Sequence, residues 1–302
     1  MTGSAGNGLE WPALPWKEWE ATASTLHMWL QIVGKTRMAL TPLQNHWWNV
    51  PLYVTARGLG TSAISYGDDV LDIEFDFLTH ALHLRRSSGQ ELSVPLRAHT
   101  VAEFYKEYLK SLDELGVSVK INPMPQEVAN PVRFDLDTEH KSYDREYVQR
   151  FWRILAHTDK VFQRFGTGFL GKVSPVHFFW GAMDLAVTRF SGRQAPPREG
   201  ADSIQREAYS HEVMSVGFWP GNGGYGAAAF YAYAAPVPAG LAEAAIGPAA
   251  AGWDKGLGEF LFKYDDMRAE ASPEEALLEF LQSSYEACAG VAKWDRAALE
   301  RR

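Results

Sequence analysis

The sequence contains one cysteine, Cys288, and this scarcity excludes whole classes of site. A single cysteine cannot form an internal disulfide, and it cannot supply a cysteine-based zinc or iron–sulfur cage. Cys288 lies within a helical pattern, and no neighbour would obviously convert its thiol to a thiolate. We therefore expect a small, buried side chain, in a chain that functions in the cytoplasm.

Membrane and nucleic-acid partners are not expected either. The chain has no run of about 18 apolar residues, which a membrane-spanning helix would need. The formal net charge is −8, and the lysines and arginines are scattered rather than gathered into a basic surface for phosphate backbones. The stretch 1–10 has neither a basic start nor an apolar segment, so we expect a flexible tail there rather than a secretory signal.

Aromatic residues, by contrast, are abundant. They make up 13% of the 302 residues and include 11 tryptophans, and 46% of the chain is hydrophobic. This is enough for a sizeable core, in one large domain or in two of ordinary size. Large aromatic side chains also line many ligand sites, so an aromatic pocket and an aromatic core are both consistent with the composition.

Apolar periodicity predicts an α+β fold. Helical spacing predicts helices over 16–33, 99–116, 142–165 and 272–294. Alternation of apolar and polar residues predicts strands between them, including one that begins at His46 and one over 176–190 that is interrupted near Gly181.

The chain divides into two halves with the same order of elements. We place the first half at 11–130 and the second at 131–302, each a helix, an antiparallel sheet and a helix, packed as one compact unit. The segments "VTARG" and "VTRFSG" lie at corresponding points of the two halves. An internal duplication explains this agreement, but common α+β patterning explains such short matches equally well.

Four segments carry a specific resemblance. "SPVHFFWG", "DLAVTRFSGR", "AYSHEV" and "GFWPG" follow one another within residues 174–221. Together they resemble a bacterial family that is known as a domain of unknown function, number five-nine-nine-six when written in words. The resemblance covers almost the whole chain, from about Trp11 to Glu300. It implies a soluble bacterial protein of one domain, and it implies no particular activity.

The same segments contain the polar residues that could perform chemistry. Stretch 174–193 places His177, Asp184 and Arg189 among apolar residues that a solvated loop would not need. General acid–base chemistry would use a histidine oriented by a carboxylate, and the candidate catalytic residues are His177, His211, Glu212 and Asp184. Arg189 would hold a substrate carboxylate or phosphate. The candidate substrate-binding walls around it are Trp180, Tyr209, Phe218 and Trp219.

Two other interpretations of these residues stay open. A single divalent metal could be held by His177, His211 and Glu212, although adjacent residues on a strand point to opposite faces. Alternatively, Asp184 and Arg189 form a buried ion pair and the histidines bond to backbone carbonyls.

Two functional hypotheses follow. The first is an enzyme that acts on a small anionic or aromatic substrate in an aromatic pocket. The second is a non-catalytic protein that binds a small ligand or serves as a scaffold. An enzyme should bring His177, His211 and a carboxylate together, whereas a binding protein should show an aromatic site with an arginine as its charged group.

Overall fold

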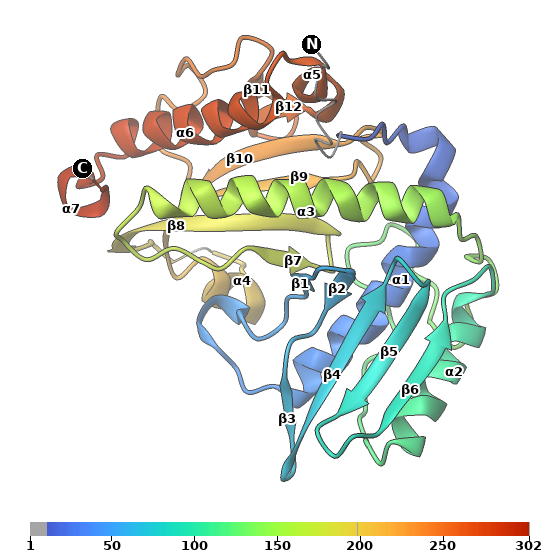
Figure 1. Cartoon of the computed structure of the whole chain (residues 1–302). Coiled ribbons are helices and arrows are strands. Elements are labelled where there is room, and N and C mark those ends of the chain that lie inside the picture. The colour runs from blue at the N-terminus through green and yellow to red at the C-terminus, as the bar shows by residue number, and fades with distance from the viewer. Residues whose placement is uncertain (1–10, 198, 302) are drawn as a thin grey trace, which may run out of the picture.

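The structure, a computed structural model, describes residues 11–197 and 199–301. These residues form two antiparallel sheets of six strands each, with helices packed against them (Figure 1). The predicted α+β fold is confirmed. The expected tail at 1–10 lies outside the described residues. Within those residues, no helix has both the length and the apolar character that crossing a membrane requires.

The first half places one sheet against two helices. Its helices are α1 (Trp16–Leu40) and α2 (Val101–Glu114), and its strands are β1 (Tyr53–Val54), β2 (Gly58–Gly60), β3 (Ile64–Tyr66), β4 (Asp69–Asp76), β5 (Ala81–Arg86) and β6 (Glu91–Pro95). The alternation predicted for β4 is present, since Leu71, Ile73 and Phe75 are fully buried. The intervening Asp72 and Glu74 lie on the other face and bond to Arg85 of the neighbouring strand.

The second half places a longer sheet against α3 and α6. Its helices are α3 (Arg145–Thr167), α4 (Ser203–Ala208), α5 (Tyr264–Ala269), α6 (Pro273–Val291) and α7 (Arg296–Leu299). Its strands are β7 (His177–Phe179), β8 (Asp184–Gln194), β9 (His211–Trp219), β10 (Ala229–Ala235), β11 (Gly252–Asp254) and β12 (Glu259–Lys263). The predicted break near Gly181 is therefore real, and it is a turn between β7 and β8.

The predicted start of a strand at His46 is wrong. Residues Asn45–Trp47 form a single 3₁₀ turn, labelled η1, and the first strand, β1, begins only at Tyr53. The φ angle of His46 is 58° and that of Trp47 is 60°. These left-handed backbone conformations cannot continue a strand, whatever the aromatic composition of the segment.

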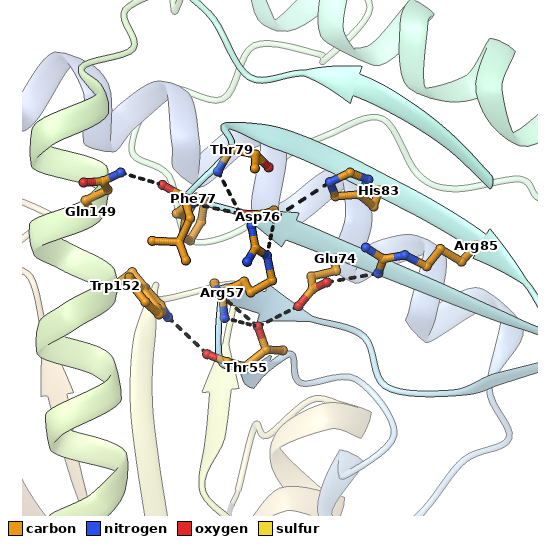
Figure 2. A network of polar contacts seen from close by, with 12 residues as sticks. Thr55, Arg57, Glu74, Asp76, Phe77, Thr79, His83, Arg85, Gln149 and Trp152 are labelled. Atoms are coloured by element: carbon orange, nitrogen blue, oxygen red, sulfur yellow. Dashed lines mark hydrogen bonds and ion pairs between the residues drawn. The ribbon is translucent and has the colours of Figure 1, made fainter.

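The two halves are joined at a strand-to-strand contact. Leu52, just before β1, and Phe178 of β7 exchange two backbone hydrogen bonds of 2.9 Å. Helix α3 completes the joint, because its side chains reach the first sheet (Figure 2). Gln149 donates to the carbonyl of Phe77 at 3.1 Å, and the Trp152 indole donates to the carbonyl of Thr55 at 3.2 Å.

The strand orders of the two sheets differ. The first sheet follows chain order from β1 to β6, except that β3 pairs with β4 outside this path. In the second sheet β12 lies between β10 and β11, so the last strands are out of chain order. The structure therefore does not confirm the internal duplication, although each half does combine helices with an antiparallel sheet.

Candidate functional site

Strand register sorts the predicted site residues onto the two faces of the second sheet. Directly paired residues share a face, and successive residues alternate. One face packs against α3 and α6, and we call the opposite one the outer face (Figure 1). The pairs His177–Ala186 and Phe179–Asp184 lie on the outer face. The predicted residues on the outer face are His177, Asp184, His211 and Trp219, and those on the helix-covered face are Arg189, Glu212 and Phe218.

Arg189 is buried as expected, but not beside a carboxylate. Its side chain is 1% exposed, and its guanidinium carbon lies 3.4 Å from the ring centre of Phe165 and 4.3 Å from that of Tyr285. It donates a hydrogen bond to the carbonyl of Phe165 in the last turn of α3. The interpretation in which Arg189 forms a buried ion pair with Asp184 is therefore wrong. Arg189 instead caps the carbonyl end of α3, where a cation is stabilised by the helix dipole.

Glu212 is also separated from the histidines. Its carboxylate lies 2.6 Å from an Arg193 nitrogen and accepts a bond of 2.9 Å from the Ser191 hydroxyl. It lines a small hollow of about 80 Å³ beside Cys288, on the helix side of the sheet. Within residues 11–197 and 199–301, no three His, Cys, Asp or Glu side chains are grouped so that they could hold a metal ion. The His177–His211–Glu212 set does not converge.

Asp184 is on the outer face, and it is held by a tyrosine. The Tyr231 hydroxyl donates to the Asp184 carboxyl, reaching across β9 from β10. Gly217 of β9 makes this possible, because a Cβ there would lie 2.2 Å from the Tyr231 ring. Burial, and then the nearby charge of Glu127, raise the pKa of Asp184 to about 7 against the lowering effect of the Tyr231 bond.

His177 lies in a box of aromatic rings. Its imidazole centre is 5.7 Å from the ring centre of Trp48, 5.6 Å from that of Tyr53 and 5.5 Å from that of Phe179. It is 1% exposed, and its Nε2 has no hydrogen-bond partner among the described residues. Burial, and then the charge of Arg37, lower the pKa of His177 to about 3, so the imidazole is neutral at ordinary pH.

Arg37 completes this group from the end of α1. One guanidinium N–H donates to the carbonyl of Thr61, whereas the buried Nε has no partner in the described chain. The guanidinium carbon lies 5.4 Å from the Tyr53 ring centre. Tyr53 in turn follows Leu52, which pairs with Phe178, so its side chain lies next to His177. We call Arg37, Trp48, Tyr53, His177 and Phe179 the His177 cluster.

A second polar group adjoins the His177 cluster through Trp48. The Lys172 ammonium donates to His46 Nε2 at 2.7 Å and lies 5.0 Å above the Trp48 ring. His46 then carries its proton on Nδ1 and donates it to the Glu207 carbonyl at 3.2 Å. The His211 ring is 5.7 Å from that of His46, so His211 reaches the same surface as His177.

The remaining predicted wall residues have structural partners. The Trp180 indole donates to the Val50 carbonyl at 2.9 Å, and its ring occupies the space left by Gly34 of α1. The Trp219 indole donates to the Asn222 side chain at 2.7 Å. Phe218 packs in the core. Tyr209 approaches the outer face through its hydroxyl, which bonds to that of Tyr233 at 3.1 Å.

The sequence interpretation missed the residues that the first half contributes. Arg37, Trp48 and Tyr53 come from outside the four family segments, and His46 was assigned to a strand. No signal in the sequence pointed to Arg37, because a basic residue in the last turn of a helix is ordinary.

The geometry can be set beside known proteins. No curated protein and no solved structure matched the chain. The model of a family of unknown function, DUF5996, matches residues 11–301. The match includes all four segments of the resemblance and every residue of the His177 cluster. The chain therefore belongs to this family of unknown function.

Proposed function

We propose that the protein binds a small anionic molecule with an aromatic or planar group at the His177 cluster. The observation that carries the proposal is that, within the described residues, the buried His177 Nε2 and the buried Arg37 Nε both lack a hydrogen-bond partner, while both side chains border the Tyr53 ring. Leaving such a group unpaired costs about 1–3 kcal/mol, so a ligand that pairs both would recover that cost. The cluster and the adjoining Lys172 are cationic in a chain of net charge −8, which favours an anion.

Each part of the cluster has a role in this proposal. Arg37 supplies an N–H and a full positive charge for a carboxylate or phosphate oxygen. His177, being neutral, supplies a hydrogen-bonding nitrogen without adding charge. Trp48, Tyr53 and Phe179 are each partly exposed, so the box reaches the surface and offers ring faces for stacking.

Binding is better supported than catalysis at His177. An acid–base histidine needs a pKa near the working pH and a group that orients it. The pKa of His177 is far below that range, and the two expected carboxylates are committed elsewhere, Asp184 to Tyr231 and Glu212 to Arg193. Metal chemistry has no grouped ligand set among the described residues.

A second candidate function, an acid–base enzyme on the same ligand, is favoured by one observation. Lys172 and His46 form a 2.7 Å donor–acceptor pair beside the His177 cluster, and Lys172 is exposed. The pair could relay a proton to a ligand held against Trp48. Incubating the protein with the bound ligand and following its mass would test this, with His46→Gln as the variant that should stop any conversion. A ligand that binds and is recovered unchanged would eliminate the enzyme and leave the binding protein.

The binding proposal is tested with three simple probes in calorimetric titrations. Benzoate carries both the ring and the charge, cyclohexanecarboxylate only the charge, and benzyl alcohol only the ring. We expect benzoate to bind most tightly and His177→Gln to weaken it about tenfold or more, as one lost hydrogen bond to a charged ligand would. Equal binding of all three probes, or benzoate binding that His177→Gln leaves unchanged, would refute the proposal.

His99 provides a matched control. It is also a buried histidine whose Nε2 has no partner in the described part of the chain, and it stacks on Trp29 in the first half. It differs in that its Nδ1 bonds to the Arg97 carbonyl at 2.7 Å and in that the charges acting on it are those of Glu107, Arg97 and Glu103. His99→Gln should therefore leave benzoate binding intact.

Location in the cytoplasm is a further part of the proposal, and it rests on the single unpaired Cys288.

A further inference from the structure

A separate hollow lies against the first turns of α3. Its volume is about 380 Å³, and it is bounded by the segment that begins at Trp11, by α3 and by α5. The residues that line it are Trp11, Pro12, Ala13, Glu146, Gln149, Arg150, Arg153 and Arg268. None of these belongs to the His177 cluster or to the residues predicted from sequence. Sites for small ligands begin at about 300 Å³, so the hollow is large enough for one.

The charges around the hollow are mostly positive. Three arginines face one carboxylate, Glu146, and Arg150 is already paired with it. Asp265, on α5, lies 3.6 Å from Arg268 and is largely exposed. Arg153 is exposed and has no ion-pair or hydrogen-bond partner within the described residues. With Asp265 counted beside the three arginines and Glu146, the surroundings of the hollow keep a net positive charge in a molecule whose total charge is −8.

Two of the arginines are held in place before any ligand arrives. Arg150 donates to the carbonyl of Ala13 at 3.2 Å, and Arg268 donates to the carbonyl of Trp11 at 3.1 Å. Backbone anchors of this kind reduce the side-chain entropy that binding would otherwise cost. The hollow also flanks the N-terminal part of the 23-residue helix α3, whose dipole adds positive potential there.

We propose that this hollow is a binding site for a small molecule that carries a phosphate group. A phosphate group suits a lining with a net positive charge, and guanidinium groups bind its oxygens in bidentate fashion. Arg153 contacts the phosphate oxygens directly, because ligand binding would not have to break an ion pair or hydrogen bond between Arg153 and the other described residues. Arg150 and Arg268 supply the pre-positioned walls, and the Trp11 side of the hollow borders the organic part of the ligand.

The experiment uses the full chain and two probes, inorganic phosphate and pyrophosphate, in calorimetric titrations at low ionic strength. We expect saturable binding that weakens as salt is added, because the contact is electrostatic. Arg153→Ala should weaken pyrophosphate binding about tenfold or more, which corresponds to one charge-assisted hydrogen bond. This variant should fold normally, since the side chain it removes is exposed and makes no ion pair or hydrogen bond with the residues that the structure describes.

Arg164→Ala is the matched control, an exposed arginine on the same helix that pairs with Glu275 outside the hollow. It should bind pyrophosphate like the unchanged protein, and so should His177→Gln, which separates this site from the His177 cluster. The proposal is overturned if Arg153→Ala binds as tightly as the unchanged protein, if Arg164→Ala loses as much affinity, or if no saturable binding occurs up to about 10 mM probe.

Discussion

His177 loses its positive charge on folding because its imidazole is buried beside Arg37. The pKa falls from an ordinary value of 6.5 to about 3. Between these two values the unfolded chain binds a proton that the folded chain does not, so folding becomes less favourable as the pH falls. The contribution of the neutral His177 imidazole to the free energy of unfolding is complete above pH 6.5 and is lost progressively as the pH falls from 6.5 to 3.

His177→Gln should remove this part of the pH dependence. We expect its free energy of unfolding to fall less steeply than that of the unchanged protein between pH 6.5 and 4, with a difference in slope of up to about 1.4 kcal/mol per pH unit. Urea denaturation at several pH values measures both slopes. Parallel profiles would mean that His177 is not buried beside a cation as described.

Asp184 should respond to pH in the opposite sense. Its pKa is raised on folding from 3.8 to about 7, so its contribution to stability is complete below pH 3.8 and is lost as the pH rises through 7. Asp184→Asn keeps an acceptor for the Tyr231 hydroxyl and has no charge to bury. We expect the variant to match the unchanged protein at pH 4 and to be more stable at pH 8 by about 1–3 kcal/mol. Thermal or urea unfolding at both pH values checks this, and a variant that is less stable at pH 8 would contradict it.

The strand β9 must carry glycine at 217 because a tyrosine from the next strand lies across it. In Gly217→Ala the new methyl group would be 2.2 Å from the Tyr231 ring, so the ring must move and release Asp184. We expect a loss of about 1–3 kcal/mol in the free energy of unfolding. Gly252→Ala is the control on β11, where a Cβ meets no atom within 4 Å, and it should change stability by less than about 0.5 kcal/mol. Equal effects of the two substitutions would exclude the packing described for Tyr231.

At the scale of single elements, sequence periodicity predicted most of the fold. Alternation in β4 and helical spacing in α2, α3 and α6 are local properties, and burial of one face enforces them; α1 is instead buried on all sides from Thr25 to Arg37. The segment at His46 was mispredicted because its aromatic content is typical of a strand, whereas its backbone is set by distant contacts. His46 is fixed by Lys172 and by the Glu207 carbonyl, which lie more than 120 residues away in sequence.

At the scale of the whole molecule, the two halves should unfold together. They share the Leu52–Phe178 pair, and α3 of the second half binds the first sheet through Gln149 and Trp152 (Figure 2). We expect one calorimetric transition in which the calorimetric and van't Hoff enthalpies agree. Two separate transitions would show that the halves are independent domains.

The joint between the two halves also explains why the candidate site could be predicted only in part. Of the aromatic rings around His177, only Phe179 comes from the same segment and could be expected from its composition; the burial of Arg189 was also foreseen. The partner charge could not be foreseen, since Arg37 reaches His177 only through the joint between the halves. From the sequence, Arg189 was expected to supply the charge beside His177, because the two residues are near each other along the chain. Strand alternation and the turn at 180–183 instead put Arg189 on the opposite face of the second sheet from His177.

The central claim is that His177 holds a free nitrogen for an anionic aromatic ligand, and nitrogen NMR of the imidazole tests it most directly. With ¹⁵N-labelled histidine, the His177 resonances should be those of a neutral ring from pH 8 to 5, as a pKa of about 3 requires. Addition of benzoate should then shift its Nε2 resonance in a saturable way, with no matching change at His99. A His177 ring that is charged at pH 5, or an Nε2 resonance that benzoate leaves unmoved while binding is detected calorimetrically, would contradict the account.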